Sequence, residues 1–315
     1  MSDAVRPVSV SNRQSLVAVT GASGFIGQHL LEKLDKSGVQ SRALIREKSG
    51  RSLQLPMSAK AIPGDLRNIG AIDRLLDGAD CCVHLAGATR SVDQAGFHLA
   101  NVIGTFWLAD RASRAGVKRF IHVSSQAARR PAISSYAASK AASEATLAPF
   151  RSAMQVTIIR PPAVIGPGDP MLQPLFDIMR FGWLPVPAEL RSGPRRFAVI
   201  SVSDLVEVIV DQVTSGTRSG QRIEPSSIAS ISWADVAGAA GVVRSKPLRL
   251  LRFWPGLLVG LGWASSAVAT MTRRALPLSS GKARELLVSD WTYDTAVQGA
   301  MTLEETIAAC LPDRS

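Results

Sequence analysis

Apolar and polar residues alternate in the first half of the chain in a way that predicts short buried strands separated by amphipathic helices. The predicted strands cover residues 16–20, 41–46, 59–63, 80–86, 120–124 and 156–160. The predicted helices cover residues 25–36, 69–76, 93–115 and 134–153. Such an alternation is typical of a parallel sheet with helices packed on it, so the pattern predicts an α/β protein.

The pattern becomes irregular after about residue 165, where prolines and glycines are frequent as far as Pro194. Helices are predicted again over residues 203–214, 233–240 and 303–310, and Ser232 is the expected N-cap of the second of these. This half is therefore expected to form a smaller and less regular region.

A glycine-rich turn lies between the first predicted strand and the first predicted helix. Glycines there let the backbone approach a pyrophosphate, and the positive N-terminus of the next helix faces the same group. The turn therefore predicts a bound dinucleotide. The residues expected to contact it are Gly21, Ser23, Gly24, Phe25, Ile26 and Gly27.

Together with the alternation of strands and helices, this turn predicts a Rossmann-type, doubly wound parallel sheet. We expect residues 1–15 to form a flexible tail and residues 16–165 to form the dinucleotide-binding domain. Residues 166–315 are expected to form an irregular C-terminal substrate-binding region, with segments that return to the main sheet.

Cations stand at the end of the second strand, where NAD-binding folds usually place an acid. Arg46 ends this strand, with Arg42 and Lys48 nearby. A cation there suits the 2′-phosphate of NADP(H), the preferred cofactor, but an arginine stacked on adenine leaves NAD(H) open. Asp65, after the third strand, is expected to accept from the adenine amino group or to be a turn residue.

A tyrosine and a lysine, Tyr136 and Lys140, are spaced to share one face of a predicted helix. The ammonium is expected to lower the pKa of the phenol, so that Tyr136 can exchange a proton with a substrate oxygen near neutral pH. Ser125, at the end of the fifth strand, is expected to bind the same oxygen, with Ser124 as its rival because only one of two consecutive residues faces the cofactor.

These motifs, in this order, make the chain resemble the extended short-chain dehydrogenases/reductases, often described as the NAD-dependent epimerase/dehydratase family. Residues 20–27, 84–87, 101–105, 117–125 and 160–169 resemble the family's motifs around the cofactor and the catalytic serine. The resemblance implies catalysis by Ser125, Tyr136 and Lys140. It also implies cofactor contacts from Tyr136 and Lys140, and from Leu66, Leu85, Ala86, Gly87, Asn101, Val123, Pro161, Pro162 and Val164.

The resemblance leaves three functions open. Steroid dehydrogenases and bacterial 3-keto-sphingolipid reductases of this family have a similar apolar, basic C-terminal part, which implies a hydrophobic ketone or alcohol such as 3-oxo-ceramide. A sugar-nucleotide epimerase or dehydratase would use Arg191, Arg195 and Arg196 to hold a pyrophosphate. The short segment 126–135 before the tyrosine and the isoleucine at position 165 are departures from that subgroup. A non-catalytic cofactor-binding subunit is the third function.

Charge and composition narrow the list of partners. The formal net charge of +11 suits an anionic partner or an arginine-rich solvated surface, but only 5% of residues are aromatic and no nucleic-acid motif is present. We therefore expect no nucleic-acid partner. Three cysteines without the spacing of a metal site predict reduced thiols and no metal, and a polar N-terminus without a signal core predicts a cytoplasmic protein.

Residues 253–271 carry no charge and are flanked by arginines on both sides. This segment has three interpretations: a buried helix of the substrate region, a helix that lies on an anionic membrane, or a membrane span. In the second, residues 249–274 would make a peripheral contact with the cytoplasmic face of a membrane. The oligomeric state is left open by the sequence.

Overall fold

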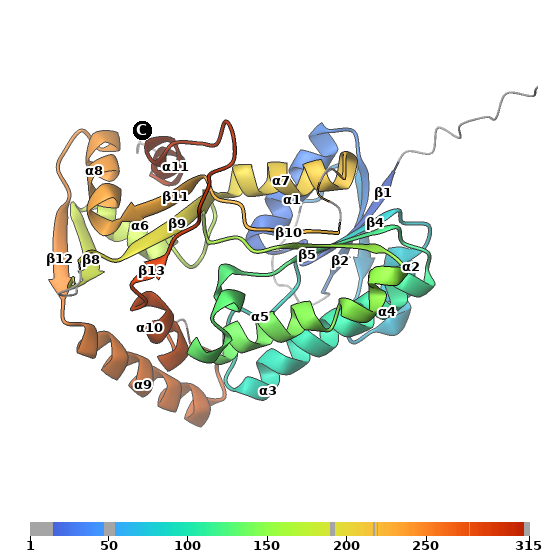
Figure 1. Cartoon of the computed structure of the whole chain (residues 1–315), viewed down its shortest axis with the longest axis horizontal. Helices are drawn as coiled ribbons and strands as arrows, with labels where there is room; N and C mark the ends of the chain where they lie inside the picture. The colour runs from blue at the N-terminus through green and yellow to red at the C-terminus, as the bar shows by residue number, and fades with distance from the viewer. Residues whose placement is uncertain are drawn as a thin grey trace, which may run out of the picture.

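A computed structural model of the protein describes residues 15–46, 54–189, 193–216, 218, 220–276 and 278–311. Nearly all of the predicted tail (residues 1–14), together with Lys48 and Arg191, lies outside the described residues. Figure 1 shows the first half of the chain, in blue to green, built around one large sheet, while much of the second half lies beyond one end of it.

Seven strands, all paired in parallel, form the main sheet in the order β10-β6-β5-β4-β1-β2-β3. The strand order reverses between β1 and β4, which is the switch point where doubly wound sheets bind ligands. The predicted α/β class and Rossmann-type sheet are confirmed. The strands are β1 (Leu16–Thr20), β2 (Gln40–Ile45), β3 (Ala59–Pro63), β4 (Cys81–His84), β5 (Arg119–Val123), β6 (Gln155–Ile159) and β10 (Arg222–Ile223).

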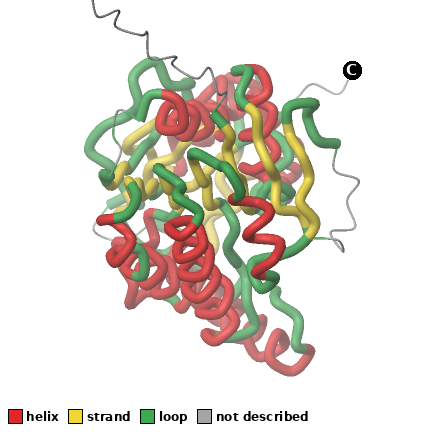
Figure 2. The backbone as a smooth tube through the Cα atoms, turned by 90° about the vertical axis from the view of Figure 1, so that its right-hand side faces the viewer, coloured by secondary structure: helices red, strands yellow, loops and turns green. Residues whose placement is uncertain are grey.

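Helices cover both faces of this sheet because successive strand residues point to opposite sides. Val17 and Val19 of β1 pack with α1 (Phe25–Lys36) and α7 (Val202–Thr214) on one face. Ala18 packs on the other face with α2 and α4. Those two helices are α2 (Ile69–Leu76) and α4 (Gly104–Arg114). In the side view of Figure 2, the yellow strands lie together with red helices packed around them.

Two predicted helices differ from the structure in detail. The helix expected over residues 93–115 is α3 (Gln94–Phe97), a π-helical segment (His98–Ile103) and α4 in direct succession. The helix expected over residues 134–153 ends early, because α5 covers Ser135–Ala145 and a 3₁₀ turn covers Ala148–Ser152. Pro149 explains this end, since a proline has no N–H and clashes with the carbonyl four residues before it.

The second half builds two small sheets beside the main one. One contains β7 (Ala163–Ile165), β9 (Arg196–Ser201), β11 (Ile228–Ser232) and β13 (Asp290–Trp291), and the other pairs β8 (Trp183–Pro187) with β12 (Arg249–Phe253). Their apolar residues pack with those of α6 (Gln173–Arg180), α8 (Trp233–Val243) and α11 (Leu303–Cys310). Strand β10 and helix α7 lie against the main sheet, so the chain crosses back to it within this half.

The uncharged segment forms α9 (Pro255–Thr272), which pairs with α10 (Ser280–Leu286). Only Leu258, Gly262 and Ala269 of α9 are buried, so the interpretation as a buried helix is wrong. No helix in the described part of the chain is both long enough and apolar enough to cross a membrane. Helix α9 therefore lies on the surface of the protein, at the outer edge of the C-terminal half (Figure 1).

Candidate active site and cofactor cradle

The glycine turn lies at the carboxyl end of β1, where Thr20 pairs with His84 of β4. Gly21 has a φ of +73°, and a Cβ atom there would lie 2.6 Å from the backbone nitrogen of Ala86. A Cβ at Gly27 would lie 2.3 Å from the carbonyl oxygen of Gly21. Both positions therefore exclude larger residues: the first keeps the turn against β4, and the second packs α1 onto β1.

The N-terminus of α1 is left uncapped by protein side chains. Its N-cap residue is Gly24, with no side-chain hydrogen bond, whereas α2, α5 and α7 are capped by Asn68, Ser134 and Ser201. Free N–H groups and the positive helix end are what a pyrophosphate requires. Ser23, Phe25 and Ile26 complete the turn and are partly buried. The cradle therefore fits a dinucleotide, as the sequence predicts.

A buried histidine ties the turn to β4 and α4. The Oγ of Thr105 donates to the carbonyl of Asn101 at 2.6 Å, so it accepts from Nε2 of His84 at 2.9 Å. Nδ1 of His84 then accepts from the hydroxyl of Thr20, 2.7 Å away. Burial lowers the pKa of His84 to about 3, which keeps the ring neutral and both bonds in place. The network was missed by the sequence analysis, because the sequence around a single histidine at a strand end does not show which side chains it will bind.

Three motifs separated in the sequence meet beside this histidine. A Cβ atom at Gly87 would lie 3.0 Å from the amide oxygen of Asn101 and 3.9 Å from Nζ of Lys140. The Asn101 side chain is buried and donates to the hydroxyl of Ser139 and to the carbonyl of Ala88. The amide is therefore engaged with protein groups that hold this loop against α5, and contact of Asn101 with the cofactor stays a prediction.

The end of β2 carries two described cations of the predicted set, which differ in exposure. Arg46 is exposed, whereas Arg42 donates to two carbonyl oxygens at the end of α2, those of Arg74 and Asp77. Asp65 accepts two hydrogen bonds from the guanidinium of Arg67, which with Arg46 lowers the pKa of its carboxyl group. Arg46, Asp65 and Arg67 therefore form a small charged group, and Arg67 was missed by the sequence analysis.

The other predicted cofactor residues fall at the carboxyl ends of the central strands. Leu85 and Ala86 follow β4 directly, and Val123 ends β5. Pro161 accepts from the backbone N–H of Gln126 at 2.9 Å, which places the segment after β6 beside the serine motif. Pro162 and Val164 continue that segment into β7, and Leu66 contacts Gly104 of α4. Contact of each with the cofactor stays a prediction.

The structure brings Ser125 and Tyr136 together and separates them from Ser124. The Ser125 side chain lies close enough to Tyr136 to lower the pKa of its phenol. Ser124 instead donates to Glu144 at 2.5 Å, on the buried side of α5. This division follows from strand alternation, which turns consecutive side chains to opposite sides. Ser125 is therefore the serine on the side of Tyr136, and its part in catalysis stays a prediction. The ring centroids of Tyr136 and Phe97 lie 5.9 Å apart.

The electrostatics of the pair differ from the expectation. Burial raises the pKa of Tyr136 to about 12, with a smaller opposing contribution from the Ser125 hydrogen bond, so the predicted lowering by Lys140 is wrong for the protein alone. Burial also lowers the pKa of Lys140 to about 8, and its Nζ donates to the carbonyl of Val123 at 2.9 Å. For both groups the removal of water outweighs the opposing contributions, which come from Ser125 for the phenol and from Glu144 for the ammonium. Tyr136 is thereby kept protonated, as a proton donor must be.

An ion pair anchors the second half of the catalytic helix. Arg160, after β6, donates to both carboxylate oxygens of Glu144, at 2.8 and 2.7 Å. Their side chains are 11% and 5% exposed. Glu144 lies one turn beyond Lys140 and favours its charged form. Sequence analysis missed this pair, because partners that are far apart in the chain leave no local pattern.

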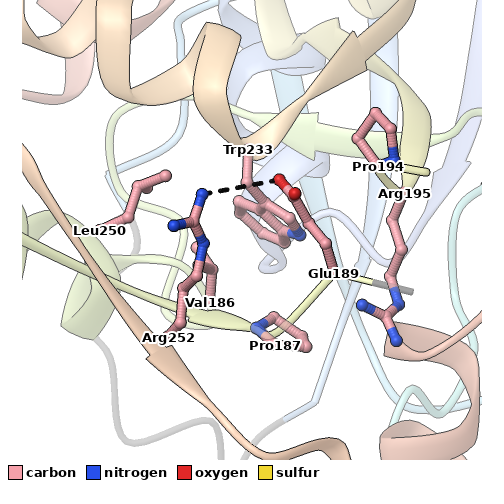
Figure 3. Close-up of a pocket in the computed structure, with 8 residues that line it drawn as sticks. All are labelled: Val186, Pro187, Glu189, Pro194, Arg195, Trp233, Leu250 and Arg252. Carbon is pink, nitrogen blue, oxygen red and sulfur yellow. Dashed lines mark ion pairs between the residues drawn. The ribbon is translucent and has the colours of Figure 1, made fainter. Parts of the chain in front are cut away.

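The proposed pyrophosphate clamp is not seen among the described arginines. Arg195 is buried and donates to the carbonyls of Ala188 and Leu287, at 2.5 and 3.4 Å. Figure 3 shows Arg195 at the wall of a small pocket in which Arg252 reaches Glu189. Arg196 donates to Ser230, and Arg191 lies outside the described residues. The guanidinium groups of Arg195 and Arg196 therefore bind protein oxygens.

The fold and the cradle define the class of the protein as an NAD(P)-dependent oxidoreductase of the short-chain dehydrogenase/reductase type. The chain belongs to the NAD-dependent epimerase/dehydratase family, whose family model matches residues 17–211. The family resemblance drawn from the motifs is thereby confirmed, and the chain is an NAD(P)-dependent enzyme of this family.

Similar proteins cover most of the chain. A ceramide reductase from Caulobacter vibrioides is 37% identical over 290 residues, which are 91% of this chain and 88% of that protein. A 3β-hydroxysteroid-dehydrogenase/decarboxylase from Arabidopsis thaliana is 24% identical over 86% of this chain and 67% of its own. WbmH from Bordetella bronchiseptica, solved with NAD⁺, has a TM-score of 0.70 at 19% identity, over 94% of this chain and 97% of that one. This last likeness shows the fold alone.

Proposed function

We propose that the protein is an NADPH-dependent reductase of a lipid-like ketone such as 3-oxo-ceramide. The observation that carries the substrate class is the extent of the match to the ceramide reductase, which includes the C-terminal half as well as the cofactor domain. A relative that shares only the cofactor domain would say nothing about substrate. An exposed apolar helix in that C-terminal half is a second reason to favour a hydrophobic substrate.

The site supports a simple reduction. The nicotinamide would supply a hydride to the carbonyl carbon. Tyr136 gives its phenolic proton to the carbonyl oxygen, while the hydroxyl of Ser125 donates a hydrogen bond to that same oxygen. The Lys140 ammonium stabilises the tyrosinate that remains, and Glu144 supports the charge on that lysine. The ketone gains one hydride and one proton and becomes a secondary alcohol.

The test is NADPH oxidation by the purified protein with 3-oxo-ceramide dispersed in detergent or vesicles. We expect turnover, and a loss of about 10²–10⁴-fold in kcat in Tyr136→Phe, the range for a positioned proton donor. A matched Tyr293→Phe variant changes the second of the two tyrosines and should keep most of the rate. Absence of turnover with this ketone would refute the substrate.

The sugar-nucleotide alternative predicts different behaviour of the purified protein. An epimerase returns its hydride to the substrate, so it would purify with bound cofactor and interconvert UDP-sugars with none added. The engagement of Arg195 with two carbonyl oxygens gives no support to that alternative. UDP-sugar interconversion without added cofactor would replace the ketoreductase proposal.

The preference for NADP(H) over NAD(H) is part of the proposal. Arg46 is exposed at the end of β2 with Arg67 near it, and a guanidinium pair of this kind suits a 2′-phosphate. Both arginines influence Asp65, so a phosphate would complete a cluster of alternating charges. NAD(H) at equal efficiency would count against the role of Arg46.

We further propose that α9 rests on the cytoplasmic face of an anionic membrane. Leu257, Leu261, Val268 and Met271 lie along one side of it, at spacings of four, seven and three residues, and are 51%, 51%, 47% and 85% exposed. Trp254 and Trp263 are 76% and 65% exposed beside them. A helix with its apolar stripe turned to solvent needs a partner.

Charge favours anionic lipid as that partner. Helix α9 contains no acidic residue, and Arg273 and Arg274 follow it while Arg249 and Arg252 precede it. All four arginines are exposed, at the two ends where lipid headgroups would lie. We expect the protein to float with phosphatidylglycerol vesicles and less with phosphatidylcholine vesicles. Flotation with neither would exclude the membrane, and self-association alone would assign the face to a second copy of the chain.

A further inference from the structure

A buried carboxylate from the C-terminal half reaches the start of the catalytic helix. Glu285 of α10 is 7% exposed, and its Oε1 accepts from the hydroxyl of Ser134 at 2.5 Å. The same hydroxyl accepts from the backbone N–H of Ala137 and caps α5, two residues before Tyr136. Glu285 thus fixes the orientation of a capping side chain 151 positions away in the sequence.

Two further contacts show that α10 is built against this point. A Cβ atom at Gly281 would lie 2.8 Å from Cβ of Ser134, so only a glycine allows the approach. Arg284 donates from Nε to the carbonyl of Ile133 at 2.9 Å. In Figure 1, α10 lies between α9 and the beginning of α5. Three residues of α10 therefore contact residues 133–134.

The other side of α10 carries the exposed helix. Gly262 of α9 packs against Ala283, and the N–H of Ser280 donates to the hydroxyl of Ser266 at 2.9 Å. One short helix thus separates the apolar surface from the cap of the catalytic helix.

We propose that Glu285 is a positioning residue for Tyr136: through Ser134 it sets the first turn of α5, and its negative charge acts on the phenol. This inference rests on the proposed catalytic role of Tyr136. Groups that act on the phenol include the Ser125 hydroxyl, which lowers its pKa, and Glu285, which raises it, while burial has the largest effect. Lys140 follows on the same helix, and Lys282 pairs with Glu285 at 3.2 Å. The carboxylate thus helps to keep Tyr136 a proton donor.

Three variants separate the capping contact from the charge. Glu285→Ala removes both, Glu285→Gln keeps an oxygen that can accept from Ser134 but removes the charge, and Ser134→Ala removes the cap. We expect Glu285→Ala to lower kcat about tenfold or more, with the KM for NADPH unchanged, and Glu285→Gln to recover much of that rate. In a Ser134→Ala background, Glu285→Ala should lose the part of its effect that passes through the cap and keep the part that comes from the charge. The matched control is Glu304→Gln, an exposed glutamate of α11 that should change nothing.

A pH readout distinguishes positioning from simple stabilisation. Both Glu285 variants should move the limb of the kcat profile that reports loss of the Tyr136 proton to lower pH, because the phenol loses its negative neighbour; loss of the Lys140 proton gives a separate limb at lower pH. A variant that is merely destabilised would lower the amount of active enzyme without moving this limb. An unchanged limb together with an unchanged kcat in Glu285→Ala would overturn the inference.

The inference can fail separately from the proposed function. If Tyr136→Phe abolishes turnover while Glu285→Ala does not reduce it, only the inference is wrong. If the wild-type protein reduces no ketone, the ultraviolet difference spectrum in a Tyr293→Phe background still reports ionisation of Tyr136, the one tyrosine that remains. Equal ionisation of Tyr136 in the wild type and in Glu285→Gln would then reject the role of the charge.

Discussion

Replacing Lys140 with methionine should stabilise the protein at neutral pH while it removes catalysis. Lys140 is 6% exposed, and burial lowers the pKa of its ammonium from 10.5 to about 8. Each pKa unit corresponds to about 1.4 kcal/mol, so holding this lysine charged in the fold at pH 7 costs on the order of 3 kcal/mol. Methionine is unbranched, apolar and similar in length, and fills the same space without that penalty.

The pH dependence has a definite sign. Between the folded pKa of about 8 and the unfolded value near 10.5, the unfolded chain binds more protons than the folded chain. The lysine therefore makes the free energy of unfolding rise with pH across this window, and below about pH 8 its full penalty remains. In Lys140→Met the free energy of unfolding lacks this rise with pH. The free energies of unfolding of the two proteins should therefore converge near pH 10.

The net gain is smaller than the penalty. The variant loses the hydrogen bond from Nζ to the carbonyl of Val123, worth about 1 kcal/mol. We therefore expect the free energy of unfolding to rise by about 2 kcal/mol at pH 7. Urea unfolding of cofactor-free protein near pH 7 and near pH 10 measures it, with Lys36→Met, at an exposed lysine of α1, as the control. A variant less stable than the wild type near pH 7 would show that burial does not penalise this ammonium.

Three more predictions concern the cofactor, the surface helix and the anchoring ion pair. Arg46→Glu should raise the KM for NADPH roughly 10–100-fold and leave that for NADH little changed, as steady-state kinetics will show. Trp254→Ser combined with Trp263→Ser should weaken binding to anionic vesicles by roughly tenfold or more in flotation, because each exposed indole contributes roughly 1–2 kcal/mol. Glu144→Ala should lower the free energy of unfolding by roughly 3–5 kcal/mol in urea, since it leaves the Arg160 guanidinium buried with one fewer partner.

Each of these has a matched control. Arg42→Met removes a nearby cation that caps α2 and should leave the ratio of NADPH to NADH use unchanged. Trp107→Ser, at an exposed tryptophan of α4, should keep vesicle binding. Glu207→Ala breaks the exposed pair with Lys33 and should cost less than about 1 kcal/mol. An equal effect in a control and its test variant would contradict the corresponding prediction.

Much of the cofactor domain could be predicted because its signals are local. The apolar pattern placed β1, α1, β3 and α2 at the bounds that the structure has, since each segment buries one face against the sheet. The glycine turn and the Tyr136–Lys140 spacing are equally local, so the sequence could locate both. The end of α5 was missed only because Pro149 was not weighed against the apolar pattern.

The contacts that tune the site arise only in the tertiary structure. Burial reversed the expected direction of the pKa shift of Tyr136. Burial depends on all the residues that pack around the phenol. Glu285 binds Ser134, which is 151 positions away in the sequence, and no local sequence pattern predicts such a partner. The sequence showed that residues 253–271 are apolar, but only the packing of α9 on α10 decided that most of them face outward. The periodicity of a segment shows which of its faces can be buried. The tertiary structure decides which partner surface that face packs against, because the partner comes from elsewhere in the chain.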